Sequence, residues 1–446
     1  MNESKGCNLL RQPHTLVRCG AMIACLLGAM PAARAELQIE ITSGVRDPVP
    51  IAIVPFAHPE GASSDLDVAD VVQHDLEGSG RFRALPRERM PAQPSRADQV
   101  VSPAWKAIGT DYVVVGRTAA LDNGSQAVDF ELVNTLTGAR LATQRFTGPS
   151  GAMRNAAHRV SDVIYQKILG VRGAFATRIA YVGVQGEAPA LHYQLIVADA
   201  DGVNPHTVLE SRFPLMSPAW SPDGQWLAYV SFETKHSAVY VQLVRSGERR
   251  QVSARAGVNG APAWSPDGHK LALTLGGSGG NPDIYVLDLA TQDLTRITDD
   301  PAIDTEPEWT PDGKSLFFTS DRAGSPQIYQ IGVSPGARPK RLTFNGNYNA
   351  RPRVSPDGSQ LAMVTLENSN YRIAVQDLAN GTVRVLSHGR LDESPSFAPN
   401  GATLIYSERE GSRGSLATVS TDGLTGLRLK ASQGEVQEPA WGPFSP

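Results

Sequence analysis

Cysteine is almost absent from this chain, and its position excludes a disulfide framework. The three cysteines (Cys7, Cys19 and Cys25) all precede residue 26 of a 446-residue sequence. Residues 1–35 have the pattern of a secretory signal, with basic residues first, an apolar run over residues 19–30, and Ala33-Arg34-Ala35 at the end. We predict cleavage after Ala35, export from the cytoplasm, and a mature protein that needs no disulfide. A lipid anchor on Cys25 is a weaker alternative, because Met22-Ile23-Ala24 matches a lipidation motif poorly.

Long apolar runs and an excess of positive charge are also missing. The run over residues 19–30 is too short to span a bilayer, and no run of spanning length follows it. Removing residues 1–35 takes four of the 41 basic and one of the 45 acidic residues, which leaves a formal net charge of −7. This charge excludes nucleic acid and anionic membrane surfaces as main partners. We expect a soluble mature protein that reaches membranes only through other proteins.

A short phrase with a proline anchor recurs six times in the second half of the chain. The copies lie at residues 217–224, 261–268, 306–313, 351–358, 394–401 and 438–443, and typical ones read SPAWSPDG and APAWSPDG. Their anchoring prolines are 43 to 45 residues apart. Strand-like segments fill the intervals, and a period of this length with such content predicts a β-propeller.

Each repeat reads as four antiparallel strands, which is one propeller blade. The two ends of the repeat region are incomplete. Residues 178–184, 193–199 and 206–210 supply second, third and fourth strands without a first, whereas residues 438–443 supply a first strand with nothing after it. We therefore predict a six-bladed propeller over residues 171–446, closed by the C-terminal strand beside residues 178–184. Closure removes two free sheet edges.

Two sets of residues recur in the repeats and are interpreted as structural. We expect the aromatic residues to pack between blades, and the aspartates to accept hydrogen bonds from nearby amides in the turns. The sets are Trp220, Trp264, Trp309 and Trp441, and Asp223, Asp267, Asp312 and Asp357.

Residues 36–170 do not repeat and predict a small α/β domain. Strands are expected at residues 36–42, 50–56, 81–86, 111–119, 127–135 and 140–146, and helices at residues 67–76, 102–108 and 153–169. Ser102 is the expected cap of the second helix, with Pro103 in its first turn. Residues 170–173 lead into the propeller.

The sequence gives little support for catalysis. Residues 276–280 match the nucleophile-elbow pattern around Ser278, but strands flank them on both sides, and that chemistry needs a strand-to-helix turn. His192, His206, His236, His269 and His388 are scattered singly, without a metal-like cluster. We predict a non-enzymatic binding platform with no cofactor and no metal. A propeller hydrolase or lyase using Ser278, and a carbohydrate or peptidoglycan binder using Tyr348, remain as alternatives.

Taken together, the ordered motifs resemble the TolB family, the periplasmic propellers of the Tol-Pal system of Gram-negative bacteria. The resemblance rests on the signal, ELQIEITSGV (36–45), PIAIVPF (50–56), the PDG repeats, LDESPSFAPNG and the final EPAWGP. It covers essentially the whole mature chain. It implies a monomeric periplasmic scaffold that supports outer-membrane integrity and constriction during cell division.

The resemblance also implies partners. The peptidoglycan-associated lipoprotein, Pal, would dock over the propeller funnel, and TolA would bind the N-terminal segment; other outer-membrane lipoproteins are further candidates. The implied Pal contacts are Asn259, Ala261, Thr305, Glu306, Arg351 and Glu393, next to Val258, where enterobacterial members are expected to carry histidine. The implied TolA segment is Glu36, Leu37, Gln38, Ile39, Glu40, Ile41, Thr42, Ser43, Gly44 and Val45. Binding of the two partners is expected to be mutually dependent.

Overall fold

The structure is a computed structural model that describes residues 37–59, 66–277, 280–411, 413–431 and 434–445. The predicted signal (1–35) and Ser278 lie outside the described residues. All described residues belong to one compact unit. Among them, no helix has both the length and the apolar character that a membrane crossing requires.

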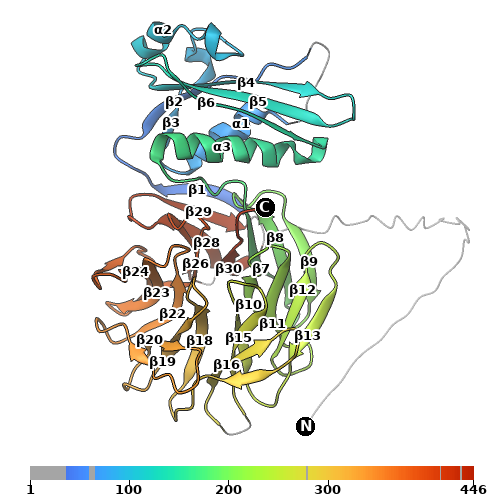
Figure 1. Ribbon diagram of the computed structural model, residues 1–446, viewed down its shortest axis with the longest axis vertical. Coiled ribbons are helices and arrows are strands. Elements are labelled where there is room, and N and C mark those ends of the chain that lie inside the picture. The colour runs from blue at the N-terminus through green and yellow to red at the C-terminus, as the bar shows by residue number, and fades with distance from the viewer. Residues whose placement is uncertain (1–36, 60–65, 278–279, 412, 432–433, 446) are drawn as a thin grey trace, which may run out of the picture. The chain divides into compact units, whose positions relative to one another are not determined.

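An α/β domain follows the first strand of the chain (Figure 1), as predicted. Its strands are β2 (Val49–Ile53), β3 (Phe82–Ala84), β4 (Tyr112–Ala120), β5 (Gln126–Asn134) and β6 (Arg140–Gly148). Its α-helices are α1 (Val68–Gly78), α2 (Ser102–Ala107) and α3 (Met153–Leu169), and its 3₁₀ turns are η1 (Arg87–Arg89), η2 (Ala97–Gln99) and η3 (Ser150–Ala152). The strands form one sheet in the order β3-β2-β4-β5-β6, in which β2 runs parallel to β3 and β4.

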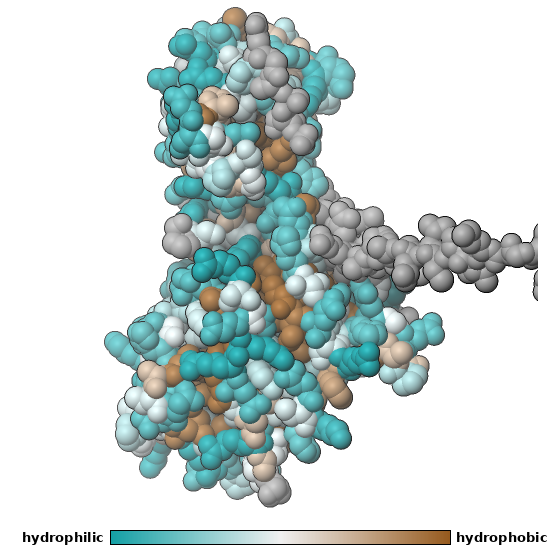
Figure 2. Space-filling model, turned by 90° about the vertical axis from the view of Figure 1, so that its right-hand side faces the viewer, coloured by the Kyte–Doolittle hydropathy of each residue, from teal (hydrophilic) through white to brown (hydrophobic). Residues whose placement is uncertain are grey.

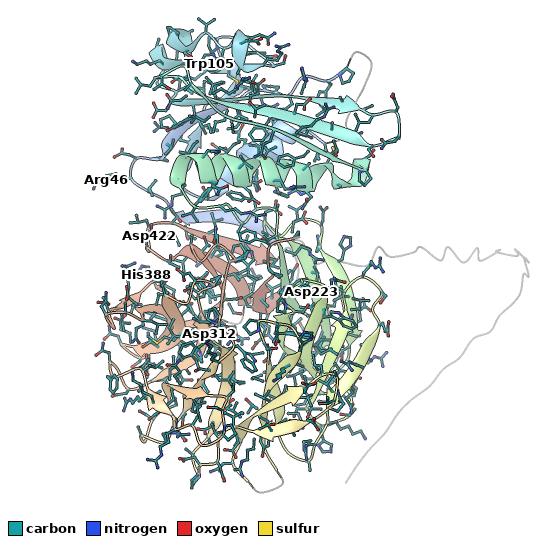
Figure 3. The ribbon with its side chains drawn as sticks, viewed as in Figure 1. Arg46, Trp105, Asp223, Asp312, His388 and Asp422 are labelled. Atoms are coloured by element: carbon teal, nitrogen blue, oxygen red, sulfur yellow. The ribbon has the colours of Figure 1, made fainter. Side chains whose placement is uncertain are left out.

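Strand β2 is buried on both faces, as its continuous apolar run predicts. Ile51 and Ile53 pack on the same side as α1 and α3, which cover that face of the sheet (Figure 1). Ala52 and Val54 pack on the other side with Trp105 of α2, which is labelled in Figure 3. Successive side chains of a strand point to opposite faces, so β2 contributes to the hydrophobic clusters on both faces of the sheet.

The helix ends follow local chemistry, with one correction. Asp67 caps α1 by accepting hydrogen bonds from Ala69 N (2.9 Å) and Asp70 N (3.3 Å). The prediction that Ser102 caps α2 is wrong, because Ser102 is the first helical residue and Val101 takes the cap position without a side-chain bond. The helix α3 ends at Gly170, whose φ of 81° lies in the left-handed region that glycine adopts at low cost.

The predicted β-propeller follows. Four strands in a row make each blade-like sheet, and the first three sheets are β10 (Leu215–Trp220) to β13 (Arg249–Ser253), β14 (Asn259–Trp264) to β17 (Leu294–Arg296), and β18 (Asp304–Trp309) to β21 (Lys340–Arg341). Between these ends lie β11 (Trp226–Ser231), β12 (Ala238–Leu243), β15 (Lys270–Leu275), β16 (Asp283–Asp288), β19 (Ser315–Ser320) and β20 (Gln327–Gly332).

The next strands belong to one continuous hydrogen-bonded sheet of nine strands. They are β22 (Asn349–Val354), β23 (Gln360–Glu367), β24 (Asn370–Asp377), β25 (Val383–Val385), β26 (Leu391–Phe397), β27 (Thr403–Glu410), β28 (Arg413–Ser420) and β29 (Gly426–Ala431). A single pair, Tyr371 with Leu391, joins β24 to β26. This sheet therefore contains two four-stranded repeats connected at one point.

The last strand of the chain pairs with the first propeller strand. β30 (Glu435–Trp441) runs antiparallel to β7 (Arg178–Gln185), with Glu435 opposite Val184 and Trp441 opposite Ile179. The sheet continues with β8 (His192–Asp199) and β9 (His206–Ser211). The first strands of successive repeats contact one another, and β30 contacts both β26 and β10.

The recurring tryptophans and aspartates have the structural roles predicted for them. The Nε1 atoms of Trp220, Trp264 and Trp309 donate to backbone oxygens of the preceding repeat over 3.1–3.2 Å, which links neighbouring sheets. The turn aspartates, two of which are labelled in Figure 3, accept hydrogen bonds from backbone amides at 3.0–3.1 Å. These residues stabilise the repeat and are not part of a single site.

The first strand departs from its predicted place. Residues 36–42 were assigned to the α/β domain, but β1 (Leu37–Ser43) instead pairs antiparallel with β29, at the edge of a propeller sheet. Alternation of side chains predicts a strand but does not specify its partner, and β29 offers a free edge. Glu36 lies outside the described residues.

Candidate protein-binding face of the propeller

Six residues with left-handed backbone mark the same position in every repeat. Each directly precedes an anchoring proline, and their φ values lie between 45° and 56°. They are Ser217, Ala261, Glu306, Arg351, Ser394 and Glu438. In each first strand the pairing register shifts at this point, as at a β-bulge. The bulge releases the amide of this residue from the ladder, and its repetition brings six side chains to equivalent places on neighbouring strands.

The released amides bond to the preceding repeat. Glu306 N donates to Thr274 Oγ1 (3.1 Å), Arg351 N donates to Thr319 Oγ1 (3.0 Å), and Glu438 N donates to Ser407 Oγ (2.9 Å). At these three bulges a threonine or serine of the preceding repeat's second strand holds the backbone. These bonds give the face a defined backbone before any partner binds.

Arg351 connects its own repeat to three others at this face. Its guanidinium lies 3.0 Å from Glu306 and 3.4 Å from Glu438, and it donates to Ser394 Oγ. Burial acts to lower the pKa of Arg351, but the carboxylates of Glu438, Glu306 and Glu393 outweigh burial and raise the pKa. The charges of these predicted contact residues are therefore largely satisfied within the propeller.

Asn259 has a different role from the one its position suggested. Its side chain is fully buried and bonds to Ser253 Oγ (2.6 Å), Arg255 N (2.9 Å) and Arg255 O (2.7 Å). Asp304, Asn349 and Asp392 are buried at the equivalent positions of other repeats. These residues hold the loops in place, so Asn259 shapes the face through its loop.

The remaining predicted contacts are partly accessible. Ala261, Thr305 and Glu393 are half-buried, and Thr305 Oγ1 lies 3.3 Å from Thr274 Oγ1. Ala261, Thr305, Glu306, Arg351 and Glu393 all belong to first strands at or beside the left-handed positions. The structure therefore brings the predicted residues to one end of the first strands.

Exposed hydrophobic residues at the same end were, apart from Val258, not anticipated from the sequence. Phe213, Met216, Val258, Ile303 and Phe344 are 36–72% exposed, and all lie in or next to segments that lead into a first strand. We call them the rim hydrophobics. By contrast, the face in Figure 2 is mainly hydrophilic, with hydrophobic residues confined to strips. In the sequence, each of the rim hydrophobics is an apolar residue in a polar loop shortly before an anchoring proline. Clusters of exposed hydrophobic residues typically mark protein-interaction surfaces.

A second group of polar residues was missed because its members are distant in sequence. Asp75, His158 and Asp201 offer potential metal ligands within 4.8 Å of one another. The prediction of single, scattered histidines concerned His192, His206, His236, His269 and His388, and this group, which contains His158, does not test it. Spacing along the chain gives no signal here, since the three residues come from α1, α3 and the turn after β8.

Comparison with known proteins identifies the family. Residues 37–141 match the TolB amino-terminal domain and residues 165–445 match the TolB beta propeller domain. The Tol-Pal system protein TolB of Xanthomonas campestris pv. campestris is 46% identical over 428 residues, which cover 95% of this chain and 97% of the relative. That of Xanthomonas oryzae pv. oryzae is 47% identical over 411 residues, covering 92% and 93%. The chain belongs to the TolB family.

A solved TolB structure supports the same assignment. The crystal structure of TolB from Acinetobacter baumannii superposes with a TM-score of 0.84 at 44% identity, covering 92% of this chain and 100% of that one. The resemblance noted in the motifs is thereby confirmed over both domains. The TolB family is a component of the Tol-Pal system, as the names of these relatives state.

Proposed function

We propose that this TolB-family protein is a periplasmic, non-enzymatic scaffold of the Tol-Pal system. It binds Pal at the end of the first strands and TolA through residues 36–45, and it supports outer-membrane integrity and constriction during division. The observation that carries the proposal is the combination, on one end of the propeller, of six equivalent left-handed residues with the rim hydrophobics. A rigid backbone with exposed apolar side chains suits recognition of a folded protein.

The proposal includes a closed ring. We propose six blades over residues 171–446, preceded by a domain over residues 36–170 whose α/β sheet begins at β2 and whose first strand, β1, pairs with the propeller strand β29. Pairing of β30 with β7, together with contacts of β30 with both β26 and β10, supports closure. A closed ring would hold the six left-handed residues in a circle around one opening.

TolA binding is proposed to involve the pairing of β1. Backbone pairing with β29 runs from Leu37 opposite Ala431 to Ser43 opposite Gly426. An edge strand held mainly by one ladder can be exchanged for another, so TolA and β29 would compete for this segment. Pal binding that shifts the docked and free populations would then change the affinity for TolA.

The Pal site is tested with charge insertions at the rim. Val258→Asp and Ile303→Asp place carboxylates at positions that are 46% and 47% exposed, so folding should be unaffected. We expect each substitution to weaken Pal binding by at least tenfold in isothermal titration calorimetry, because a desolvated carboxylate would be unpaired in the complex. Leu136→Asp is the matched control, since Leu136 is 68% exposed in the α/β domain. Unchanged affinity in both rim variants would refute the site.

The TolA segment is tested by truncation. A mature protein lacking residues 36–45 should lose TolA binding and retain Pal binding. Loss of both TolA binding and Pal binding, together with the circular dichroism spectrum of an unfolded chain, would instead indicate that β1 is required for folding. Retained TolA binding by the folded truncated protein contradicts the assignment.

A further inference from the structure

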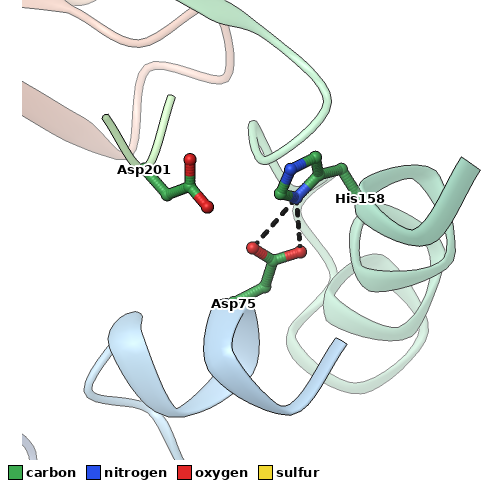
Figure 4. A group of neighbouring side chains, drawn as sticks. All are labelled: Asp75, His158 and Asp201. Atoms are coloured by element: carbon green, nitrogen blue, oxygen red, sulfur yellow. Dashed lines mark hydrogen bonds and ion pairs between the residues drawn. The ribbon is translucent and has the colours of Figure 1, made fainter. Parts of the chain in front are cut away.

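A cluster of charged residues joins the α/β domain to the propeller. Arg154 of α3 lies 3.1 Å from Asp199 and donates a hydrogen bond to Asp201. Asp199 is the last residue of β8, and Asp201 lies in the turn that follows. His158, one helical turn after Arg154, is 2% exposed, and Asp75 of α1 lies beside it (Figure 4). We call these five residues the junction cluster.

Asp75 fixes the orientation of the His158 ring. The Nδ1 atom of His158 lies 2.8 and 3.0 Å from the two oxygens of Asp75. Asp75 also accepts a hydrogen bond from Ser161 Oγ (2.6 Å). A carboxylate bonded to Nδ1 keeps the proton there, so the other nitrogen, Nε2, presents a lone pair.

The lone pair of Nε2 faces further acceptors. Nε2 is buried and has no hydrogen-bond partner among the described residues. Asp199 Oδ2 lies 3.9 Å away, and the Asp201 carboxylate faces the ring from the side opposite α3 (Figure 4). An acceptor buried against acceptors is unfavourable unless a cation lies between them. A proton on Nε2, a metal ion, or a water molecule that donates to Nε2 would relieve this unfavourable contact.

Charge favours a divalent ion. The three carboxylates and the single guanidinium of the junction cluster sum to −2 when the imidazole is neutral. One proton removes half of that charge, whereas a divalent ion removes all of it. Imidazole nitrogen and carboxylate oxygen are both zinc ligands, and a second carboxylate that orients the imidazole is common around zinc.

We propose that the junction cluster binds one Zn²⁺ ion through His158 Nε2 and the carboxylates of Asp199 and Asp201, with Asp75 orienting the imidazole. Ligand atoms around tetrahedral zinc are about 3.3 Å apart, so the distance between Nε2 and Asp199 Oδ2 must shorten by about 0.6 Å. Side-chain rotation supplies a shift of this size. Asp199 Oδ2 accepts hydrogen bonds from Arg154 Nε (3.1 Å) and Asn204 Nδ2 (2.8 Å), so the ion would have to displace at least one of these donors.

Zinc would tie the two domains together, because its nitrogen ligand comes from α3 and its oxygen ligands come from the propeller. A ligand that binds only the assembled junction stabilises that arrangement by mass action. A proton on His158 Nε2 would compete with zinc for this position. Burial acts to lower the pKa of His158, while Asp75 and Asp201 outweigh burial and raise it, with Arg154 opposing them.

The test uses the mature full-length protein, freed of metal with EDTA and titrated with ZnCl₂ in a calorimeter. We expect one ion per chain and a melting temperature that rises by several degrees with zinc. His158→Gln and Asp201→Asn should weaken binding at least 100-fold, and Asp75→Asn about 10- to 100-fold, as is usual for a group that orients a ligand. The control is His192→Gln, an exposed histidine at the start of β8, which should bind zinc as the unmodified protein does.

Absence of stoichiometric binding, or unchanged binding in His158→Gln, would overturn the proposal. If that variant fails to fold, the zinc absorption edge of the unmodified protein decides, because a spectrum without an imidazole nitrogen excludes His158 as a ligand. If the melting temperature changes with pH where His158 titrates but does not change with zinc, a proton rather than a zinc ion lies between His158 Nε2 and the carboxylates. Pal binding is independent of each of these outcomes.

Discussion

At the scale of single residues, the propeller face depends on paired charges. Arg351 is the shared partner of Glu306 and Glu438, which belong to the preceding and a later repeat. The sequence indicated that these positions lie near one opening, because each precedes an anchoring proline. It could not indicate which charges pair, since the partners are 45 and 87 residues away.

Replacing Arg351 by methionine should destabilise the propeller. Glu306 and Glu438 would then lie close together without their cation, at a cost of about 2 kcal/mol in the free energy of unfolding for these partly buried groups. The measurement is urea denaturation at pH 7. Arg353→Met is the control, because Arg353 lies 4.0 Å from Glu308 and should cost less than about 1 kcal/mol. Equal losses in the two variants would contradict the role of Arg351.

Asp392 makes stability depend on pH. Burial raises the pKa of Asp392 to about 6, aided by Glu408 and opposed by hydrogen bonds from Ser387 and Gly389. A pKa raised by folding gives stability that is complete below the unfolded value of 3.8 and is lost as pH rises through about 6. Asp392→Asn should remove this pH-dependent loss, which amounts to about 2–3 kcal/mol in the free energy of unfolding between pH 4 and pH 7. Asparagine suits the site, since Asn259 and Asn349 occupy the equivalent positions.

The matched control for Asp392 is Asp304→Asn. Asp304 is buried at the equivalent position but pairs with Arg322 at 2.7 Å, so losing its charge leaves a cation without its main partner. Urea denaturation from pH 4 to pH 8 should show Asp392→Asn more stable than the unmodified protein at pH 7 and Asp304→Asn less stable. Identical pH profiles for Asp392→Asn and the unmodified protein would refute the assignment.

At the scale of elements, most strands and helices were predictable from the sequence. Buried apolar runs located β2 and β4, helical spacing located α1 and α3, and the 43–45-residue period located the propeller strands. β1 was assigned to the wrong sheet, because its alternating pattern fits any exposed edge. The junction cluster was not predictable, because it forms only when α1, α3 and the turn after β8 meet.

The C-terminal strand should be essential to the propeller. Deleting residues 435–446 removes the partner of β7 and the acceptor of Trp220 Nε1, which is Ala440 O at 3.2 Å. We expect the melting temperature to fall by more than about 10 °C, since the edge of β7 becomes free and buried apolar surface is exposed. Deleting only residues 443–446, which follow β30, should have a much smaller effect. An unchanged melting temperature in the longer deletion would contradict a ring held by β30.

At the scale of the whole molecule, the proposed binding functions belong to different parts of the chain. The repeats form the framework; in the proposed function the loops before the first strands would recognise Pal, and β1 would be available to TolA. Asn400 Nδ2 donates to Arg172 O, and Arg81 pairs with Asp422, which is labelled in Figure 3. Both propeller residues lie in turns at the opposite end of their strands from the rim hydrophobics. The proposed Pal face and the α/β domain therefore lie at different ends of the strands.

Hydrogen exchange of the mature protein with and without Pal distinguishes Pal binding at the rim from Pal binding at the turns. If Pal binds at the rim, we expect slower exchange in peptides that cover residues 213–217, 256–261 and 301–306, with little change in the turns at residues 221–224, 265–268 and 310–313. Both sets belong to the same repeats and differ only in the end of the first strand at which they lie. Protection of the turns, with the rim peptides unchanged, would contradict the account.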